Sequence, residues 1–103
     1  MSVRLQWTKE KRGRLFVNPC GFATKEKVKY GLHNGSSDLI GFEYVNRYPV
    51  FCCVEIKTKA YPKLSKEQKI WLDMVVNIGG RAYIAREKKD EYVIEEYAAN
   101  KPE

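Results

Sequence analysis

The chain lacks any hydrophobic run long enough to span a membrane. The segment from Met1 to Lys11 also lacks the apolar stretch of a signal peptide, so we expect a cytoplasmic protein with no membrane partner. Repeats, low-complexity segments and linkers are absent as well. The 103 residues therefore predict one compact domain over positions 1–103, with a modest core.

Residues that usually bind zinc are scarce. The three cysteines and one histidine have no spacing typical of a zinc site. Cys52 and Cys53 are adjacent in a strand-like run, so their side chains should face opposite ways and should not pair with each other. Reduced thiols are the expected state. His33 lies in a glycine-flanked loop, where a lone histidine is more often idle than catalytic.

Acidic residues are outnumbered, because 19 Lys and Arg stand against 13 Asp and Glu and leave a net charge of +6. The basic residues form three clusters: Lys9, Lys11, Arg12 and Arg14; Lys25, Lys27 and Lys29; and Lys57, Lys59, Lys63, Lys66 and Lys69. A polyanion is the natural partner of such a chain. A solvated, lysine-rich surface is the plainer interpretation, and the charge alone does not separate the two.

The apolar pattern predicts an α/β domain. Residues 37–45 and 48–58 are strand-like and are joined by a two-residue loop at Asn46-Arg47. Shorter strands are expected at 15–18 and 81–86. The segment 91–99 fits either a strand or a short terminal helix, and its apolar residues favour the strand.

A helix is predicted from Ser65 to Ile78, with Ser65 as N-cap and Gln68 as its capping-box partner. Gly79-Gly80 would end it. Its apolar stripe is expected to consist of Ile70, Trp71, Met74, Val75 and Ile78. A strand, a helix and a strand in succession predict a crossover connection onto a central sheet.

Three charged residues interrupt otherwise apolar strands. Glu55 and Lys57 are two residues apart, so they face the same side of their strand. A two-residue loop at Asn46-Arg47 pairs Val45 with Tyr48, and the same register sets Asp38 opposite Glu55, with Cβ atoms about 5 Å apart. Two carboxylates that close require a bridging cation or a proton. Taken singly, these residues fit a turn cap and an exposed ion pair; taken together, they predict a metal-dependent site for cutting phosphodiesters.

Gln68 has two compatible interpretations. As the third helical residue it completes a capping box, which is a purely structural role. The helix also begins soon after the strand that carries Glu55 and Lys57. Its first turn would then lie near the site, where Gln68 could hydrogen-bond a water, a metal ligand or a phosphate.

The ordered series Gly31-Leu32-x-x-Gly35-Ser36-Ser37-Asp38, Val54-Glu55-Ile56-Lys57-Thr58, Leu64-Ser65-x-Glu67-Gln68 and Gly79-Gly80 resembles the VRR-NUC nucleases of the PD-(D/E)xK superfamily. The match covers about Leu15 to Arg86. The resemblance implies a restriction-endonuclease-like core, a central mixed sheet with a shortened N-terminal helix, and Mg²⁺- or Mn²⁺-dependent cleavage of DNA. The family's small members are viral or bacterial proteins, so a viral protein acting in a bacterial host is one expected setting.

Site residues carry over from the same resemblance. Asp38 and Glu55 would bind the metal, with the Ile56 carbonyl as a further ligand. Lys57 would be the catalytic lysine and Gln68 an auxiliary residue. The family usually has an additional glutamate on an opening helix; here Glu10 is the only acid before the first strand, and its spacing is poor. That ligand is therefore absent or comes from another chain.

The remaining predictions concern the partners of the chain and its alternative function. Four lysines near the site are expected to contact DNA: Lys59, Lys63, Lys66 and Lys69. The resemblance implies a homodimer acting on four-way junctions or other branched DNA. Such a dimer would also bury Trp7, which one short chain does not easily cover. The alternative function is a non-catalytic nucleic-acid-binding module that keeps the nuclease fold.

Overall fold

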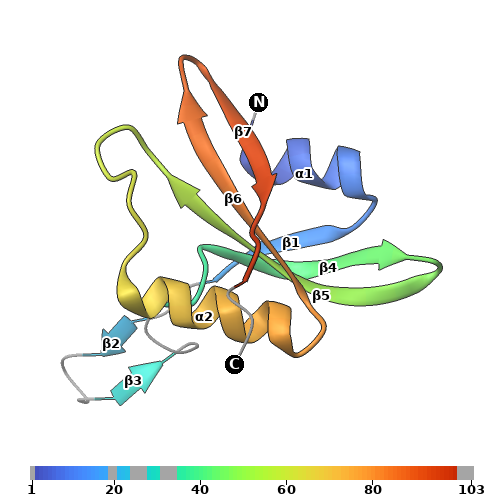
Figure 1. Cartoon of the computed structure of the whole chain (residues 1–103), viewed down its shortest axis with the longest axis horizontal. Helices are drawn as coiled ribbons and strands as arrows, with labels where there is room; N and C mark the ends of the chain where they lie inside the picture. The colour runs from blue at the N-terminus through green and yellow to red at the C-terminus, as the bar shows by residue number, and fades with distance from the viewer. Residues whose placement is uncertain (1, 19–20, 24–27, 31–34, 100–103) are drawn as a thin grey trace.

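The computed structural model describes residues 2–18, 21–23, 28–30 and 35–99 (Figure 1). These residues form two helices and seven strands. In chain order they are α1 (Val3–Lys11), β1 (Arg14–Val17), β2 (Gly21–Ala23), β3 (Val28–Tyr30), β4 (Leu39–Val45), β5 (Tyr48–Lys57), α2 (Lys66–Asn77), β6 (Arg81–Lys88) and β7 (Glu91–Glu96).

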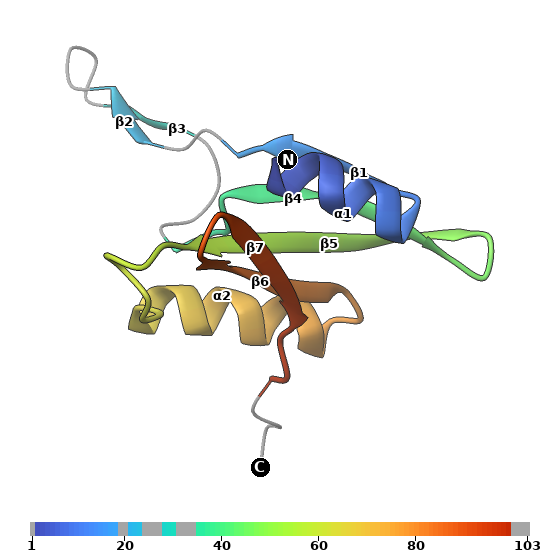
Figure 2. The same cartoon turned by 90° about the horizontal axis from the view of Figure 1, so that it is seen from above.

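The main sheet has five strands in the order β1-β4-β5-β6-β7. Strands β5 and β6 are parallel and are connected through α2, while the other neighbours are antiparallel. The short pair β2–β3 stands apart from this sheet. Helix α1 covers one face and α2 covers the other (Figure 2). This mixed sheet confirms the predicted restriction-endonuclease-like α/β fold, and the segment 91–99 contributes a strand.

Helix α1 is short but well anchored. The Ser2 hydroxyl caps it by accepting a hydrogen bond from the Leu5 N–H at 3.1 Å. It ends at Arg12, which adopts a left-handed conformation with φ of 54°. Of the helices within the described ranges, neither α1 nor α2 is long and apolar enough to cross a membrane.

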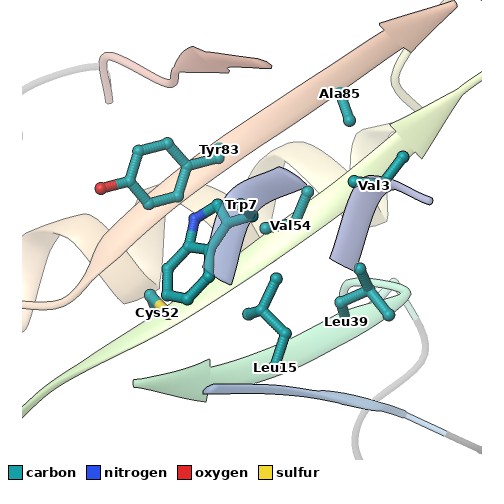
Figure 3. Packing of buried hydrophobic residues seen from close by; sticks show 8 residues of the cluster. All are labelled: Val3, Trp7, Leu15, Leu39, Cys52, Val54, Tyr83 and Ala85. Carbon is teal, nitrogen blue, oxygen red and sulfur yellow. The ribbon is translucent and has the colours of Figure 1, made fainter. Parts of the chain in front are cut away.

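One core lies between α1 and the sheet (Figure 3). Trp7 is completely buried there, and its ring meets the Tyr83 ring edge-on, with centroids 6.2 Å apart. The buried members of this cluster are Val3, Trp7, Leu15, Leu39, Cys52, Val54, Tyr83 and Ala85. A single chain therefore buries Trp7 by itself. The expectation that Trp7 needs a second copy for its burial is wrong, because the nine residues of α1 already lie flat on the sheet.

The second core lies between α2 and the sheet. It confirms Trp71 and Val75 of the predicted stripe and corrects its other three members. Leu72 and Val75 are buried, whereas Ile70, Met74 and Ile78 are exposed by 59%, 40% and 72%. The side of α2 that faces the sheet carries the apolar residues Trp71, Leu72, Val75 and Val76. Gln68 lies one turn before Leu72 on that side and reaches Glu55.

The two adjacent cysteines lie on opposite faces of the sheet, one in each core. Cys52 belongs to the core under α1, and Cys53 to the core under α2. Both thiols are buried and free, as expected from the alternation of a strand. Because Glu55 and Lys57 follow Cys53 at steps of two, their side chains lie on the α2 face.

Candidate active site

The hairpin β4–β5 sets the register of the site. Asn46 and Arg47 form its turn, with φ of 50° and 70°, the left-handed values that a two-residue hairpin loop needs. Val45 pairs with Tyr48, and the pairing continues in step to Leu39 opposite Val54. Asp38 is the next residue along. Its Oδ2 accepts a hydrogen bond from the Ile56 N–H at 2.8 Å, so the predicted apposition of Asp38 with the 55–57 segment is present.

Asn18 holds the segment that carries Asp38. Its side-chain amide donates to the Ser36 hydroxyl and to the Ser37 carbonyl, both at 2.8 Å. Its backbone N–H donates to the Asp38 carbonyl at 2.9 Å. Sequence reasoning missed this residue, because the only hint is a polar residue directly after a short strand. Asn18 therefore links the end of β1 to the approach to β4.

Gly35 brings the same segment against α2. Its φ of 87° is left-handed, and a Cβ at this position would lie 2.6 Å from the Glu67 carbonyl carbon. Only glycine permits so close an approach to the helix backbone. The Gly-Ser-Ser-Asp sequence is thus a close-packed link between the first turn of α2 and the start of β4. Gly31, Leu32 and His33 lie outside the described residues.

The Glu55 carboxyl is buried at the site, and its pKa is raised. It is 3% exposed, and its Oε1 accepts a hydrogen bond from Gln68 Nε2 at 2.9 Å. Its Oε2 is buried and has no hydrogen-bond partner among the described residues. Burial and the neighbouring Asp38 carboxylate raise the Glu55 pKa to about 8, although Lys57 opposes the shift. A carboxylate in this position needs either a proton or a cation.

Lys57 and Gln68 complete a polar chain on the same face. Lys57 is 7% exposed, and its Nζ donates to Gln68 Oε1 at 2.8 Å and lies 3.9 Å from Glu55 Oε1. The capping box is also formed, since Gln68 Oε1 accepts from the Ser65 N–H at 2.8 Å. The capping role of Gln68 is therefore confirmed, and the same side chain joins Glu55 to Lys57, while its role in a reaction stays a prediction.

The donor set suits a hard divalent cation. Asp38 and Glu55 offer carboxylate oxygens, and the unpartnered Glu55 Oε2 is the kind of atom that a metal satisfies. The described residues contain no group of three or more His, Cys, Asp or Glu side chains arranged to hold a metal. Glu10 is exposed on α1, which covers the opposite face of the sheet. The Ile56 carbonyl stays a predicted ligand.

The comparison with family models agrees with this geometry. The chain matches the model of the VRR-NUC domain over residues 2–89. The protein belongs to the VRR-NUC domain family. Membership implies a nuclease-type function and a nucleic-acid substrate. The PD-(D/E)xK superfamily is consistent with the match. No curated protein and no solved structure matches the chain.

A basic groove adjoins Lys57 in this VRR-NUC domain. The cavity has a volume of about 230 Å³, and its lining consists of Lys57, Thr58, Lys59, Pro62, Arg86, Glu87 and Lys88. Of the four lysines predicted to contact DNA, only Lys59 lines it. Lys63, Lys66 and Lys69 are exposed around the start of α2.

Arg86 is the basic residue that sequence reasoning missed. It pairs with Lys57 in the parallel register of β5 and β6. Its guanidinium donates to the Pro62 carbonyl and to Glu95 Oε1, each at 2.8 Å, which ties the loop before α2 to the sheet. The sequence predicted the strand 81–86 that carries Arg86. Its register against β5 depends on how α2 packs, so the neighbour of Lys57 could not be named in advance.

Proposed function

We propose that this VRR-NUC domain is a Mg²⁺- or Mn²⁺-dependent endodeoxyribonuclease that acts in the cytoplasm. One observation carries the proposal: a buried carboxylate with a free oxygen, Glu55, lies between a second carboxylate, Asp38, and a lysine, Lys57. An ion pair alone would not call for the second acid. Two acids and a lysine are the groups that metal-assisted hydrolysis of a phosphodiester requires.

Each residue has a distinct task in that reaction. A bound divalent cation would acidify a water and offset the charge of the phosphate. Asp38 and Glu55 would hold the cation through their carboxylate oxygens. Lys57 would orient the attacking water, whose oxygen forms the new bond to phosphorus as the P–O bond to the leaving sugar oxygen breaks, and would hydrogen-bond the phosphate oxygens that gain negative charge. Solvent would take the proton that the attacking water loses and would protonate the leaving oxygen. Gln68 is a positioning residue, because its amide fixes both the Lys57 ammonium and the Glu55 carboxylate.

A cleavage panel tests the proposal. Linear, flapped and four-way DNA substrates are incubated with Mg²⁺, with Mn²⁺ and with EDTA. Asp38→Ala, Glu55→Ala and Lys57→Ala should each abolish cleavage, and the exposed control Glu91→Gln should not. Cleavage at the wild-type rate by any of the three alanine variants, or by the wild type in EDTA, contradicts the assignment.

We further propose that the active form is a homodimer that cuts branched DNA, such as a four-way junction. One domain with a single site cannot cut two strands symmetrically without reorienting, whereas two copies about a two-fold axis can. The exposed apolar residues Ile70, Met74 and Ile78 on the outer face of α2 are better candidates for the contact than Trp7, which is buried. Light scattering tests this: a monomer mass together with full activity on four-way junctions contradicts it.

One observation favours the alternative function, a non-catalytic DNA-binding module. Within the described ranges only Asp38 and Glu55 supply carboxylates at the site, without a third acid beside them. A module of this kind would bind DNA equally with and without Mg²⁺ and would cut none of the panel. The same cleavage experiment therefore separates the two functions.

A further inference from the structure

A second basic surface lies far from the carboxylates. In Figure 1 the end of α1 and the end of β4 lie on the right, whereas the first turn of α2, which carries Gln68, lies on the left. Between α1, β1 and β4 is a hollow of about 320 Å³. Its lining consists of Thr8, Arg12, Gly13, Arg14, Phe42 and Tyr44. Asp38 directly precedes β4 and Tyr44 lies near the far end of this strand. About 20 Å therefore separates the two residues at the usual rise of a strand.

The charge of the hollow comes from two exposed arginines, Arg12 and Arg14. Neither takes part in an ion pair with any other residue that the structure describes. Arg12 is fixed at its backbone, since its N–H donates to the Thr8 carbonyl at 3.0 Å as α1 ends. Arg14 is held in β1 opposite Phe42. Both guanidinium groups are therefore available for an anion, and phosphate is an anion whose geometry their planar fork matches.

The rest of the lining is aromatic. The Phe42 and Tyr44 rings are 5.5 Å apart and meet edge-on at 80°, so the half-buried Phe42 supports the ring above it. Tyr44 is 56% exposed. A fixed aromatic ring open to solvent beside unpaired arginines has the composition of a site for unpaired nucleotides.

We infer that this hollow binds a single-stranded segment of DNA, with one base stacked on Tyr44 and the adjoining phosphates bound by Arg12 and Arg14. The inference rests on the proposed function in taking DNA as the ligand. A duplex is the weaker occupant, because its bases already stack on one another and would leave the tyrosine ring without a role. Branched and flapped DNA offers unpaired nucleotides beside a duplex. The hollow would therefore favour such substrates over linear duplexes.

Binding of fluorescent oligonucleotides in EDTA tests the inference without any catalysis. Tyr44→Ala should weaken binding of a single-stranded oligothymidine by at least about fivefold, and Tyr44→Phe should retain it because the ring is kept. The matched control is Tyr48→Ala, an exposed tyrosine at the hairpin turn that does not line the hollow. A base analogue whose fluorescence is quenched by stacking should lose its quenching only in Tyr44→Ala.

Each result supports or overturns the site. Joint replacement of Arg12 and Arg14 by Gln should weaken single-strand binding and lower its salt dependence. Wild-type affinity of Tyr44→Ala for the oligothymidine overturns the inference, as does an equal loss of affinity for linear duplex. If the wild type binds through Tyr44 but cuts none of the cleavage panel, the inference stands and the proposed nuclease activity fails.

Discussion

Replacing Glu55 by Gln should stabilise the metal-free protein at alkaline pH. Burial and Asp38 raise the Glu55 pKa from 4.5 to about 8, so between these values the folded chain binds a proton that the unfolded chain does not. The free energy of unfolding must then fall as pH rises through this window. Glutamine resembles the protonated acid and cannot ionise, so the variant should lose that part of the pH dependence.

The size of the effect follows from the same shift. At about 1.4 kcal/mol for each tenfold change in proton affinity, the shift sets an upper limit of about 5 kcal/mol. Water penetration and relaxation around a buried charge reduce such values in proteins. We expect Glu55→Gln to gain about 2 kcal/mol above the Glu55 pKa, a rise in Tm of about 10 °C for a domain of this size.

Thermal melting in EDTA across the pH range measures this directly. The wild type should lose stability between about pH 5 and pH 9, and Glu55→Gln should lose clearly less. Mg²⁺ should raise the wild-type Tm above the Glu55 pKa, because it replaces the proton, and Glu55→Gln should remove that rise. Parallel pH profiles of the wild type and Glu55→Gln in EDTA would refute the reasoning. The exposed control Glu91→Gln should behave as the wild type.

Three further predictions concern neighbouring groups. Lys57→Ala should lower the single-turnover rate of cleavage by about 100-fold or more, whereas the Mg²⁺ affinity measured by calorimetry should change far less. An equal loss of rate and affinity would make Lys57 a structural residue. Asn18→Ala removes two hydrogen bonds from the Asp38 segment, so it should lower the free energy of unfolding in urea by about 1–3 kcal/mol and weaken Mg²⁺ binding. Wild-type values in both assays would contradict the role of Asn18 in holding this segment. DNA binding in EDTA should weaken steeply with salt. Reversing the charges of Lys63 and Lys66 together should lower the slope of log affinity against log salt concentration by about 2. An affinity that does not change with salt would exclude the electrostatic contribution.

Local chemistry in the sequence was enough to predict which residues meet at the centre of the candidate site. A two-residue turn leaves one register for the strands on either side, so Asn46-Arg47 already implied that Asp38 meets the strand of Glu55 and Lys57. Ser65 and Gln68 form a cap with groups only three residues apart, so the start of α2 could be predicted as well. The turn and the cap each depend on residues close together in the sequence, and the turn then fixes the pairing of the more distant residues on its two strands.

Tertiary packing decided the rest. The side of α2 that faces the sheet carries Trp71, Leu72, Val75 and Val76, so Ile70 and Met74 are left outside. Gln68 on the packed side reaches Glu55 and Lys57. Asn18, Arg86 and the hollow at Tyr44 likewise depend on contacts between segments far apart in the chain. The free energy of such contacts comes from shared burial and from hydrogen bonds across elements, and no local pattern records which elements will meet.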